Sequence, residues 1–334
     1  MNNQHMSLLT TWYQNKDSFS WVLATIIETK GSSYRKSGAM MLFNSLGKSY
    51  GLLSGGCLEA DLLKQAQKCL QLNQAISVCY DMRDESDIAW QLGIGCGGMV
   101  KVLLQPINKT NNYLDLPFLY KQLQQNLICY YQISSKDNDF ENTVLNSENL
   151  TTIASSSKVF TIKPRTRLVV FGGGIDAIPV INIAKQMDWH ITLIDSRTAY
   201  ARKERFKDAD TIIQSHYQQS TVSDAVDSAN AIVIMHHNIH LDAQALDTLT
   251  STQAKFIGLL GPQHRTDRVF AQASISAEQL PCQLANPIGL DLGGELPEAI
   301  ALSIIAQIQA QLENASCMSL GLYTTASKDI SHAS

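Results

Sequence analysis

Hydrophobic residues fall into two blocks of short runs along the chain, with a mainly polar stretch between them. In the first block, runs rich in β-branched and aromatic residues predict strands at residues 20–29, 38–43, 48–53, 76–80 and 99–104. After the third run, apolar positions recur at helical spacing and predict a helix over residues 54–72, with Ser54 as its N-cap. The first block therefore mixes strands with a helix.

The second block alternates strands and helices. Short apolar runs predict strands at residues 167–171, 190–194, 211–213, 231–235 and 255–259. Helices are predicted over residues 179–187 and 297–312, and the other gaps leave room for helices. Strands that alternate with helices in this way predict a parallel sheet covered on both faces.

The polar stretch between the blocks is rich in turn-forming residues, and we interpret it as a variable connection with one or two strands. The predicted fold class is α/β, with an N-terminal α/β domain followed by a C-terminal Rossmann-like domain that has a parallel sheet. The predicted limits are 1–105 for the N-terminal domain, 106–165 for the connection, 166–312 for the C-terminal domain and 313–334 for a polar tail.

Composition and charge exclude several classes of protein. Of 334 residues, 45% are hydrophobic and 17% are charged, so the chain has enough apolar material for sizeable cores. The net charge is −4 and no run of lysine or arginine occurs, which argues against nucleic-acid binding. The apolar runs are too short to span a bilayer and the first residues lack a signal-peptide pattern, so we expect no membrane association. The seven cysteines form no C-x-x-C pair, which argues against a zinc ribbon and favours a cytoplasmic protein with reduced thiols.

A glycine-rich loop opens the second block. Gly172, Gly174 and Ala177 have G-x-G-x-x-A spacing between a predicted strand and a predicted helix, and Asp195 follows the next strand. In this arrangement the glycines let a pyrophosphate approach the backbone, the helix N-terminus offers N–H groups, and the acidic residue accepts ribose hydroxyls. The loop therefore predicts a Rossmann fold with NAD(P) as a candidate cofactor. Asp176 adds a negative charge inside the loop, so a Rossmann domain kept only as a scaffold stays open.

Three glycine-rich segments of the first block, at residues 29–35, 54–59 and 93–98, are typical of ligand-binding loops. Serine hydroxyls and the Arg35 guanidinium of the first segment suit a phosphate. Cys57 lies at a predicted helix start, where a thiol pKa falls, and is either a reactive thiolate or a small buried filler. The candidate ligand-contacting residues of these segments are Gly31, Ser32, Arg35, Gly55, Gly56, Cys57, Glu59, Cys96 and Gly97.

Two further features have more than one interpretation. Glu59 is a candidate acid or base, a partner of a metal, or simply a charge favoured by the helix dipole. His236, His237 and His240 follow a predicted strand, at the edge where α/β sheets bind ligands. They form either a metal site or a place where one histidine, His237, contacts a cofactor.

Taken together, these residues resemble the XdhC/CoxI family, the accessory factors of xanthine dehydrogenase and related molybdenum hydroxylases. The resemblance runs from about residue 20 to residue 312. In the first block the matching residues are 31–32, 35, 38–39, 53–59 and 96–98. In the second block they are 171–174, 176–177, 195–197, 199–200, 204–206, 237–238, 241–242, 257–262, 265–266, 287–295 and 297–298. Tyr34 and Ile175 depart from the family pattern, which has proline and histidine there.

The resemblance implies a chaperone that binds the molybdenum cofactor, a molybdopterin with a phosphate tail, and has no turnover of its own. Such a protein holds the cofactor while a cysteine desulfurase supplies the terminal sulfido ligand. It then inserts the cofactor into the apo-subunit of a xanthine dehydrogenase-like hydroxylase. Because molybdenum is thiophilic, Cys96 among its glycines is the candidate molybdenum contact. A homodimer is also left open.

Two other functions stay open on the sequence alone. The glycine loop and Asp195 favour an NAD(P)-dependent oxidoreductase, although no clear acid–base pair accompanies them apart from His237. The negative charge of Asp176 in the loop favours a protein-interaction module in which both ligand sites are vestigial.

Overall fold

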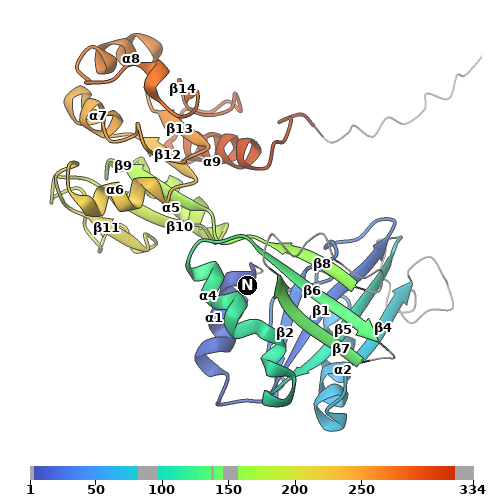
Figure 1. Ribbon diagram of the computed structural model, residues 1–334. Helices are drawn as coiled ribbons and strands as arrows, with labels where there is room; N and C mark the ends of the chain where they lie inside the picture. Colours follow the sequence, from blue (N-terminus) through green and yellow to red (C-terminus); the bar gives the residue numbers. More distant parts are fainter. Residues whose placement is uncertain (1–3, 82–96, 137–138, 146–156, 320–334) are drawn as a thin grey trace, which may run out of the picture. The chain divides into compact units, whose positions relative to one another are not determined.

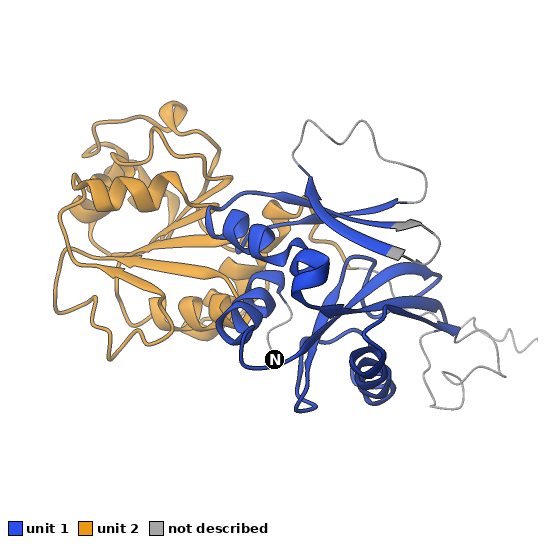
Figure 2. Ribbon diagram, turned by 60° about the horizontal axis from the view of Figure 1, so that its bottom comes forward, with its two compact units in different colours: residues 1–165 blue, residues 166–334 orange. Residues whose placement is uncertain are grey.

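The structure is a computed structural model that describes residues 4–81, 97–136, 139–145 and 157–319. The chain divides into two compact units, residues 1–165 (unit 1) and residues 166–334 (unit 2), which Figure 2 shows in different colours. Both units combine helices and sheets, so the predicted α/β class is confirmed. The finer domain limits predicted from the sequence stay predictions.

Unit 1 is built from antiparallel sheets and helices. Its strands are β1 (Trp21–Lys30), β2 (Met40–Asn44), β3 (Ser49–Tyr50), β4 (Ile76–Asp81), β5 (Met99–Ile107), β6 (Cys129–Lys136), β7 (Asp139–Leu145) and β8 (Ser157–Ile162). Its helices are α1 (His5–Asn15), α2 (Glu59–Leu72), the 3-10 helix η1 (Lys109–Asp115) and α4 (Leu116–Gln124). One sheet has the strand order β3–β2–β1–β5–β4 and the other β7–β6–β8 (Figure 1).

The five-stranded sheet of unit 1 is buried on both faces, as the alternation of side chains along β1 shows. Val22 and Ile26 pack against α2 on one face. Trp21 and Leu23 belong to the core on the other face, which α1, α4 and the three-stranded sheet close. Helix α2 therefore covers one face, as Figure 1 shows, and the second sheet forms a further layer on the opposite face.

A buried amide pair also joins the two sheets of unit 1. Gln105 of β5 donates to the Asn142 side chain of β7 (2.6 Å), and Asn142 donates back to Gln105 (3.1 Å). The same Asn142 amide donates to the Tyr131 hydroxyl of β6 (2.8 Å), which itself donates to the Leu114 carbonyl (2.6 Å). These polar groups are all buried and satisfied by one another.

Helix α2 begins at Glu59 rather than at the predicted Ser54. Gly55 and Gly56 have φ angles of +79° and +113°, which no right-handed helix contains, so this stretch forms a loop. The N-cap position belongs to Leu58, whose N–H donates to the Ser54 hydroxyl (2.8 Å). The prediction of Ser54 as the N-cap is therefore wrong, because the glycines serve the loop and not the first helical turn.

The stretch 106–165 contains more structure than the one or two strands expected, because β6, β7 and β8 all lie in it. Its strands bury alternate positions, as β6 shows: Tyr131 and Ile133 are buried, whereas Gln132 and Ser134, which alternate with them, are half-exposed. Only one face of this small sheet packs on the core, so its sequence carries half the apolar content of a doubly buried strand.

Unit 2 has a parallel sheet with helices between its strands. The strands are β9 (Arg167–Phe171), β10 (His190–Ile194), β11 (Thr211–Ile213), β12 (Ala231–Ile234), β13 (Phe256–Leu259) and β14 (Leu284–Ala285). The helices are α5 (Ala177–Gln186), α6 (Ser220–Asp227), α7 (Ile239–Leu246), α8 (Gln263–Phe270), the 3-10 helix η3 (Ala277–Gln279) and α9 (Pro297–Leu312). The strand order is β11–β10–β9–β12–β13–β14, and every neighbouring pair is parallel.

This strand order is that of a doubly wound Rossmann sheet. Helices α5 and α9 pack on one face, and α6, α7 and α8 supply the core of the other face. The order reverses between β9 and β12, and ligands of such sheets bind at the carboxyl ends of the strands at that point. The predicted parallel sheet is confirmed.

None of the helices in the described part of the chain combines the length and the apolar character that crossing a lipid bilayer requires.

Candidate functional site

The glycine-rich segments predicted for unit 1 meet at the edge of the five-stranded sheet that is formed by the ends of its strands, where β1 ends and β5 begins. A Cβ atom on Gly31 would lie 3.5 Å from the Gly97 carbonyl oxygen, so the first and third segments touch through their backbones. A Cβ atom on Gly55 would lie 3.3 Å from the Tyr34 ring, which places the second segment against the first. Residues far apart in the sequence therefore form one surface.

The candidate residues on this edge are accessible to a ligand. The exposed ones are Gly31, Ser32, Gly55, Gly56, Cys57 and Gly97. The predicted role of Cys96 lies outside the described residues, as do Gly93 and Gly95 of the same segment.

Glu59 holds the loop that carries Cys57. Its Oε1 atom accepts hydrogen bonds from the N–H groups of Leu53 (3.0 Å) and Ser54 (2.9 Å), and its Oε2 atom accepts one from the Ser54 hydroxyl (2.5 Å). Burial by itself opposes ionisation, but these hydrogen bonds outweigh it and lower the pKa of Glu59. The Glu59 carboxylate therefore holds the conformation of the loop through these hydrogen bonds. This role adds to the helix-dipole effect expected from the sequence.

A cavity of about 610 Å³ lies beside the Tyr34 segment. Arg35 and Lys36 line it and give it positive charge, and Phe160 of β8 closes it against Gly38. His5 lies on its wall with Nε2 3.0 Å from the Gly38 carbonyl oxygen, and burial lowers the pKa of this histidine. The cavity suits an anionic group next to an apolar ring.

The exposure of Cys57 separates it from the other thiols of the unit 1 core. Cys69 is buried, which raises its pKa to about 12, and burial likewise raises the pKa of Cys129 to about 11. Both fill space in the core. Cys57 instead lies on the exposed loop edge, so the filler interpretation does not apply to it.

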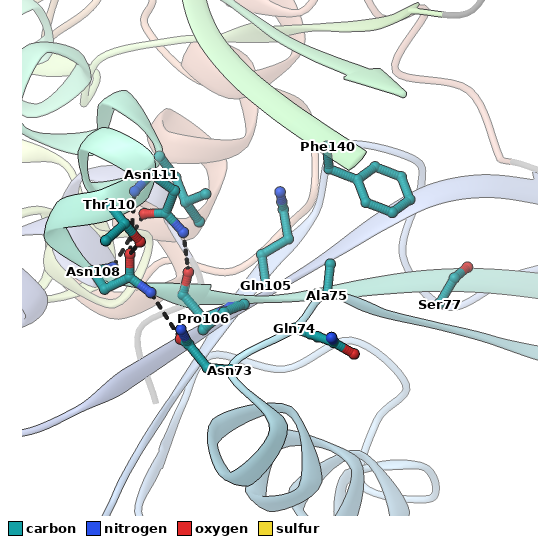
Figure 3. Close-up of a pocket in the computed structure, with 11 residues that line it drawn as sticks. Asn73, Gln74, Ala75, Ser77, Gln105, Pro106, Asn108, Thr110, Asn111 and Phe140 are labelled. Carbon is teal, nitrogen blue, oxygen red and sulfur yellow. Dashed lines mark hydrogen bonds between the residues drawn. The ribbon is translucent and has the colours of Figure 1, made fainter. Parts of the chain in front are cut away.

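A second cavity of unit 1, of about 750 Å³, lies beside the carboxyl end of β5 and is shown with its lining side chains in Figure 3. Its walls carry neutral amides and the ring of Phe140. Asn108 donates to Asn73 (2.9 Å), and Asn111 donates to the Pro106 carbonyl (2.6 Å). Most of these amides are already paired and the described lining residues include no charged side chain, so this cavity is not part of the candidate site.

In unit 2, the glycine loop follows β9 as predicted. The N–H of Gly172 donates to the Ile194 carbonyl (2.9 Å), which ties the loop to β10. Gly172 has φ +107°, and a Cβ atom there would lie 2.7 Å from the backbone nitrogen of His236. The loop therefore packs backbone to backbone against the chain that leaves β12, and only glycine fits.

Asp195 points back into the protein. Its Oδ1 accepts from the backbone N–H and the Nε of Arg197 (both 2.9 Å), and its Oδ2 accepts from Arg197 Nη2 and the Gly173 N–H (both 2.8 Å). Burial favours the neutral acid, but these bonds outweigh it and lower the pKa of Asp195. The ribose-binding residue expected from the sequence is thus fully buried and fully engaged.

His237 and Asp176 pair above the glycine loop. His237 has φ +56°, and its Nε2 lies 2.5 Å from Asp176 Oδ2. The pair lines a cavity of about 600 Å³ whose other walls include Tyr200, Leu260 and Ile300. The sequence pattern predicted that His237 lies near a ligand, but it did not predict Asp176 as its partner, because Asp176 is 61 positions away.

His236 belongs to a buried network that the sequence analysis did not detect. Its Nδ1 lies 2.8 Å from Asp242 Oδ1, and its Nε2 lies 2.7 Å from the Tyr217 hydroxyl. Asp242 also accepts a hydrogen bond from Arg265, which donates to the Leu260 carbonyl as well (3.1 Å). The sequence does contain a signal for this network. Asn238 caps α7 and Asp242 lies in the first turn of this helix, which turns the carboxylate back toward β12.

The three histidines do not converge. His236 faces the buried network, His237 faces Asp176, and His240 lies 3.1 Å from the Gln244 amide on α7. Among the residues that the structure describes, no group of three or more histidine, cysteine and acidic side chains is placed to hold a metal ion.

His237 is expected to titrate above its usual pKa of about 6.5. The hydrogen bond to Asp176 favours the protonated ring and raises the pKa of His237. This contact stabilises the fold fully below pH of about 6.5, and the stabilisation is lost as the pH rises through the raised pKa. NMR titration of the His237 ring protons measures the midpoint, and Asp176→Asn should move it back toward about 6.5. A wild-type midpoint at or below that value contradicts the pairing.

Comparisons with known proteins agree with this architecture. The family model described as the XdhC Rossmann domain matches residues 168–308, and the model of the XdhC and CoxI family matches residues 17–81. A protein of Bacillus subtilis (strain 168), described as a probable xanthine dehydrogenase subunit, is 30% identical over 313 residues, which cover 88% of this chain and 93% of that protein.

Two further proteins extend the comparison. The molybdenum cofactor insertion chaperone PaoD of Escherichia coli (strain K12) is 20% identical over 300 residues, covering 86% of this chain and 82% of that protein. A crystal structure of a protein described as a xanthine dehydrogenase from Bacillus halodurans has a TM-score of 0.81 at 30% identity, covering 93% of this chain and 96% of that chain. The resemblance inferred from the motifs is confirmed.

Proposed function

The chain belongs to the XdhC and CoxI family, and we propose that it is an accessory factor that binds the molybdenum cofactor as cargo and inserts it into a molybdenum hydroxylase of the xanthine dehydrogenase type. The name of the Escherichia coli relative, a molybdenum cofactor insertion chaperone, supports this role. The name of the Bacillus subtilis relative supports a hydroxylase of this type as the client.

The observation that carries the proposal is the edge of unit 1 where the glycine-rich segments meet. Gly31 and Gly97 touch through their backbones, Tyr34 covers Gly55, and Cys57 is exposed beside them. A planar pterin needs backbone groups within reach and no side chains in the way, which glycines provide. This edge is therefore the proposed cargo site.

The residues present suit such a cargo. Arg35 and Lys36 line the neighbouring cavity and complement a phosphate tail. The hydroxyl of Ser33 is buried and has no hydrogen-bond partner among the described residues, so it suits a ligand oxygen or a water. A thiolate is a soft ligand, so the exposed Cys57 and, from the sequence alone, Cys96 are the proposed contacts to the molybdenum end.

The finer steps of the proposal follow from the family. The protein would hold the cofactor while a cysteine desulfurase supplies the terminal sulfido ligand, and would then release it to the apo-hydroxylase. In this role the chain binds, orients and shields its cargo, and has no turnover of its own. The proposal leaves the oligomeric state open, including a homodimer.

The alternative of an NAD(P)-dependent oxidoreductase is disfavoured by the geometry of unit 2. Asp195 has no acceptor left for a ribose, and the Asp176 carboxylate lies over the glycine loop. The residues present therefore do not fit NAD(P). The third possibility, a protein-interaction module with vestigial sites, would give no cofactor binding at all, which the following experiment tests.

Anaerobic loading tests the proposal. The purified chain is incubated with molybdenum cofactor, desalted, and assayed for bound molybdenum and for the fluorescent oxidised pterin. We expect near-stoichiometric retention by the wild type and a loss of roughly tenfold in Cys57→Ser or Cys96→Ser. Cys317→Ser, which changes an exposed thiol elsewhere, should retain the cargo.

The pattern of loss assigns the contact. Loss in one variant only places the molybdenum end at that thiol, and loss in both places it between the two loops. Full retention in both variants contradicts the thiol contact. No retention by the wild type contradicts the cargo function as a whole.

A further inference from the structure

We propose that the Rossmann unit rejects dinucleotides, because two of its own side chains hold the positions that the ribose and the pyrophosphate of NAD(P) would take. The inference concerns unit 2 alone and goes beyond the proposed cargo function of unit 1. Arg197 and Asp176 are the residues that set this specificity.

Arg197 takes the place of the ribose. A carboxylate has about four positions at which it can accept hydrogen bonds. Asp195 fills them with two bonds on each oxygen, three of them from Arg197 and one from the Gly173 N–H. The Arg197 guanidinium is further held over the Tyr200 ring, with its central carbon 3.7 Å from the ring centre. A ribose hydroxyl would have to displace Arg197 to reach Asp195.

Asp176 takes the place of the pyrophosphate. The second glycine of the loop, Gly174, lacks a side chain so that phosphates can approach the backbone at the start of the helix. In this protein the position of a Gly174 Cβ is overlapped by the Asp176 Oδ1 atom. The other oxygen of this carboxylate, Asp176 Oδ2, lies 2.5 Å from His237 Nε2. The Asp176 carboxylate, held by His237, therefore occupies the anion position of α5, and a phosphate would have to displace it.

The described residues that line the rest of the cavity offer no unpaired cationic side chain to a phosphate. Both cationic groups of its lining are already paired, Arg197 with Asp195 at 2.8 Å and the protonated His237 with Asp176 at 2.5 Å. Apolar side chains make up much of the remaining lining, with Ile175 70% and Ile300 36% exposed. The cavity thus offers no unpaired cation to a dinucleotide among the described residues that line it.

Calorimetry on the full chain tests the inference with NADH, NADPH and inorganic pyrophosphate as probes. The wild type is expected to give no saturable heat at millimolar ligand. Asp176→Ala empties the anion position, and we expect it to bind pyrophosphate at least about tenfold more tightly than the wild type. Asp267→Ala removes an exposed carboxylate from α8 and matches the change in net charge, so it should behave as the wild type.

A double variant tests both blocks together. Asp176→Ala with Arg197→Ala also frees Asp195, and it should bind NADH more tightly than Asp176→Ala does. Because this change leaves a buried carboxylate without its partner, its folding is checked by thermal melting. If the double variant does not fold, the pyrophosphate comparison between Asp176→Ala and Asp267→Ala decides.

Two results would overturn the inference. One is saturable binding of NADH or NADPH by the wild type below millimolar concentration. The other is equal pyrophosphate binding by Asp176→Ala and Asp267→Ala, since the carboxylate would then exclude nothing. Neither result bears on cargo loading by unit 1, so the two proposals can fail separately.

Discussion

Replacing Asp242 by asparagine is expected to lower the free energy of unfolding by about 3 kcal/mol. The Asp242 carboxylate is fully buried and accepts hydrogen bonds from Arg265 and from the His236 ring. The amide keeps the shape of the side chain but removes its charge, so the partly buried Arg265 loses its ion pair. Loss of one partner is costly because the other charge stays desolvated.

Urea unfolding followed by circular dichroism measures this effect. Asp267→Asn, an exposed position on α8, is the matched control and should change the free energy by less than about 0.5 kcal/mol. Asp242→Leu combined with Arg265→Met should regain part of the loss, because neither charge then remains. A free energy of unfolding for Asp242→Asn equal to that of the control would show that the network does not stabilise the unit.

Replacing Gly98 by alanine is expected to reduce cofactor retention by roughly tenfold. An added Cβ would overlap the carbonyl oxygen of Ser32 and lie 2.7 Å from that of Lys30. Both neighbours are backbone atoms, so the two segments must separate and the proposed cargo site opens. Overpacking of this kind should also cost about 1–3 kcal/mol in the free energy of unfolding.

The anaerobic loading assay measures the retention of Gly98→Ala. Gly47→Ala is the matched control, because it makes the same substitution at a position where the added Cβ would meet nothing within 4 Å. The control has positive φ and should lose some stability, yet it should keep its cargo. Equal retention by the two variants would show that the contact between the segments does not shape the site.

The sequence predicted what depends on local patterns. The apolar run before Gly172 and the run before Asp195 each predicted a strand of the parallel sheet, and both strands are present. The glycine-rich segments of the first block also lie where a ligand can reach them, apart from the part outside the described residues. Spacing and hydrophobic pattern encode such features within a few residues.

What the sequence did not predict depends on contacts between distant residues. Asp195 has the right place for ribose binding, but the direction of its carboxylate depends on Arg197 and on the glycine loop. His236 and His237 are neighbours in the sequence, yet one is buried against Asp242 and the other is exposed. Side-chain direction of this kind is set by tertiary packing, which no short motif records.

The amide pair between the two sheets of unit 1 limits how they can move. Apolar side chains attract one another without a preferred direction, so a purely apolar interface tolerates small sliding movements. Gln105 and Asn142 bond through both of their amide ends, and Tyr131 extends the chain of bonds to the helical segment before α4. A lateral shift would break several directional bonds at once in a place that water does not reach. These residues therefore fix the position of one sheet relative to the other.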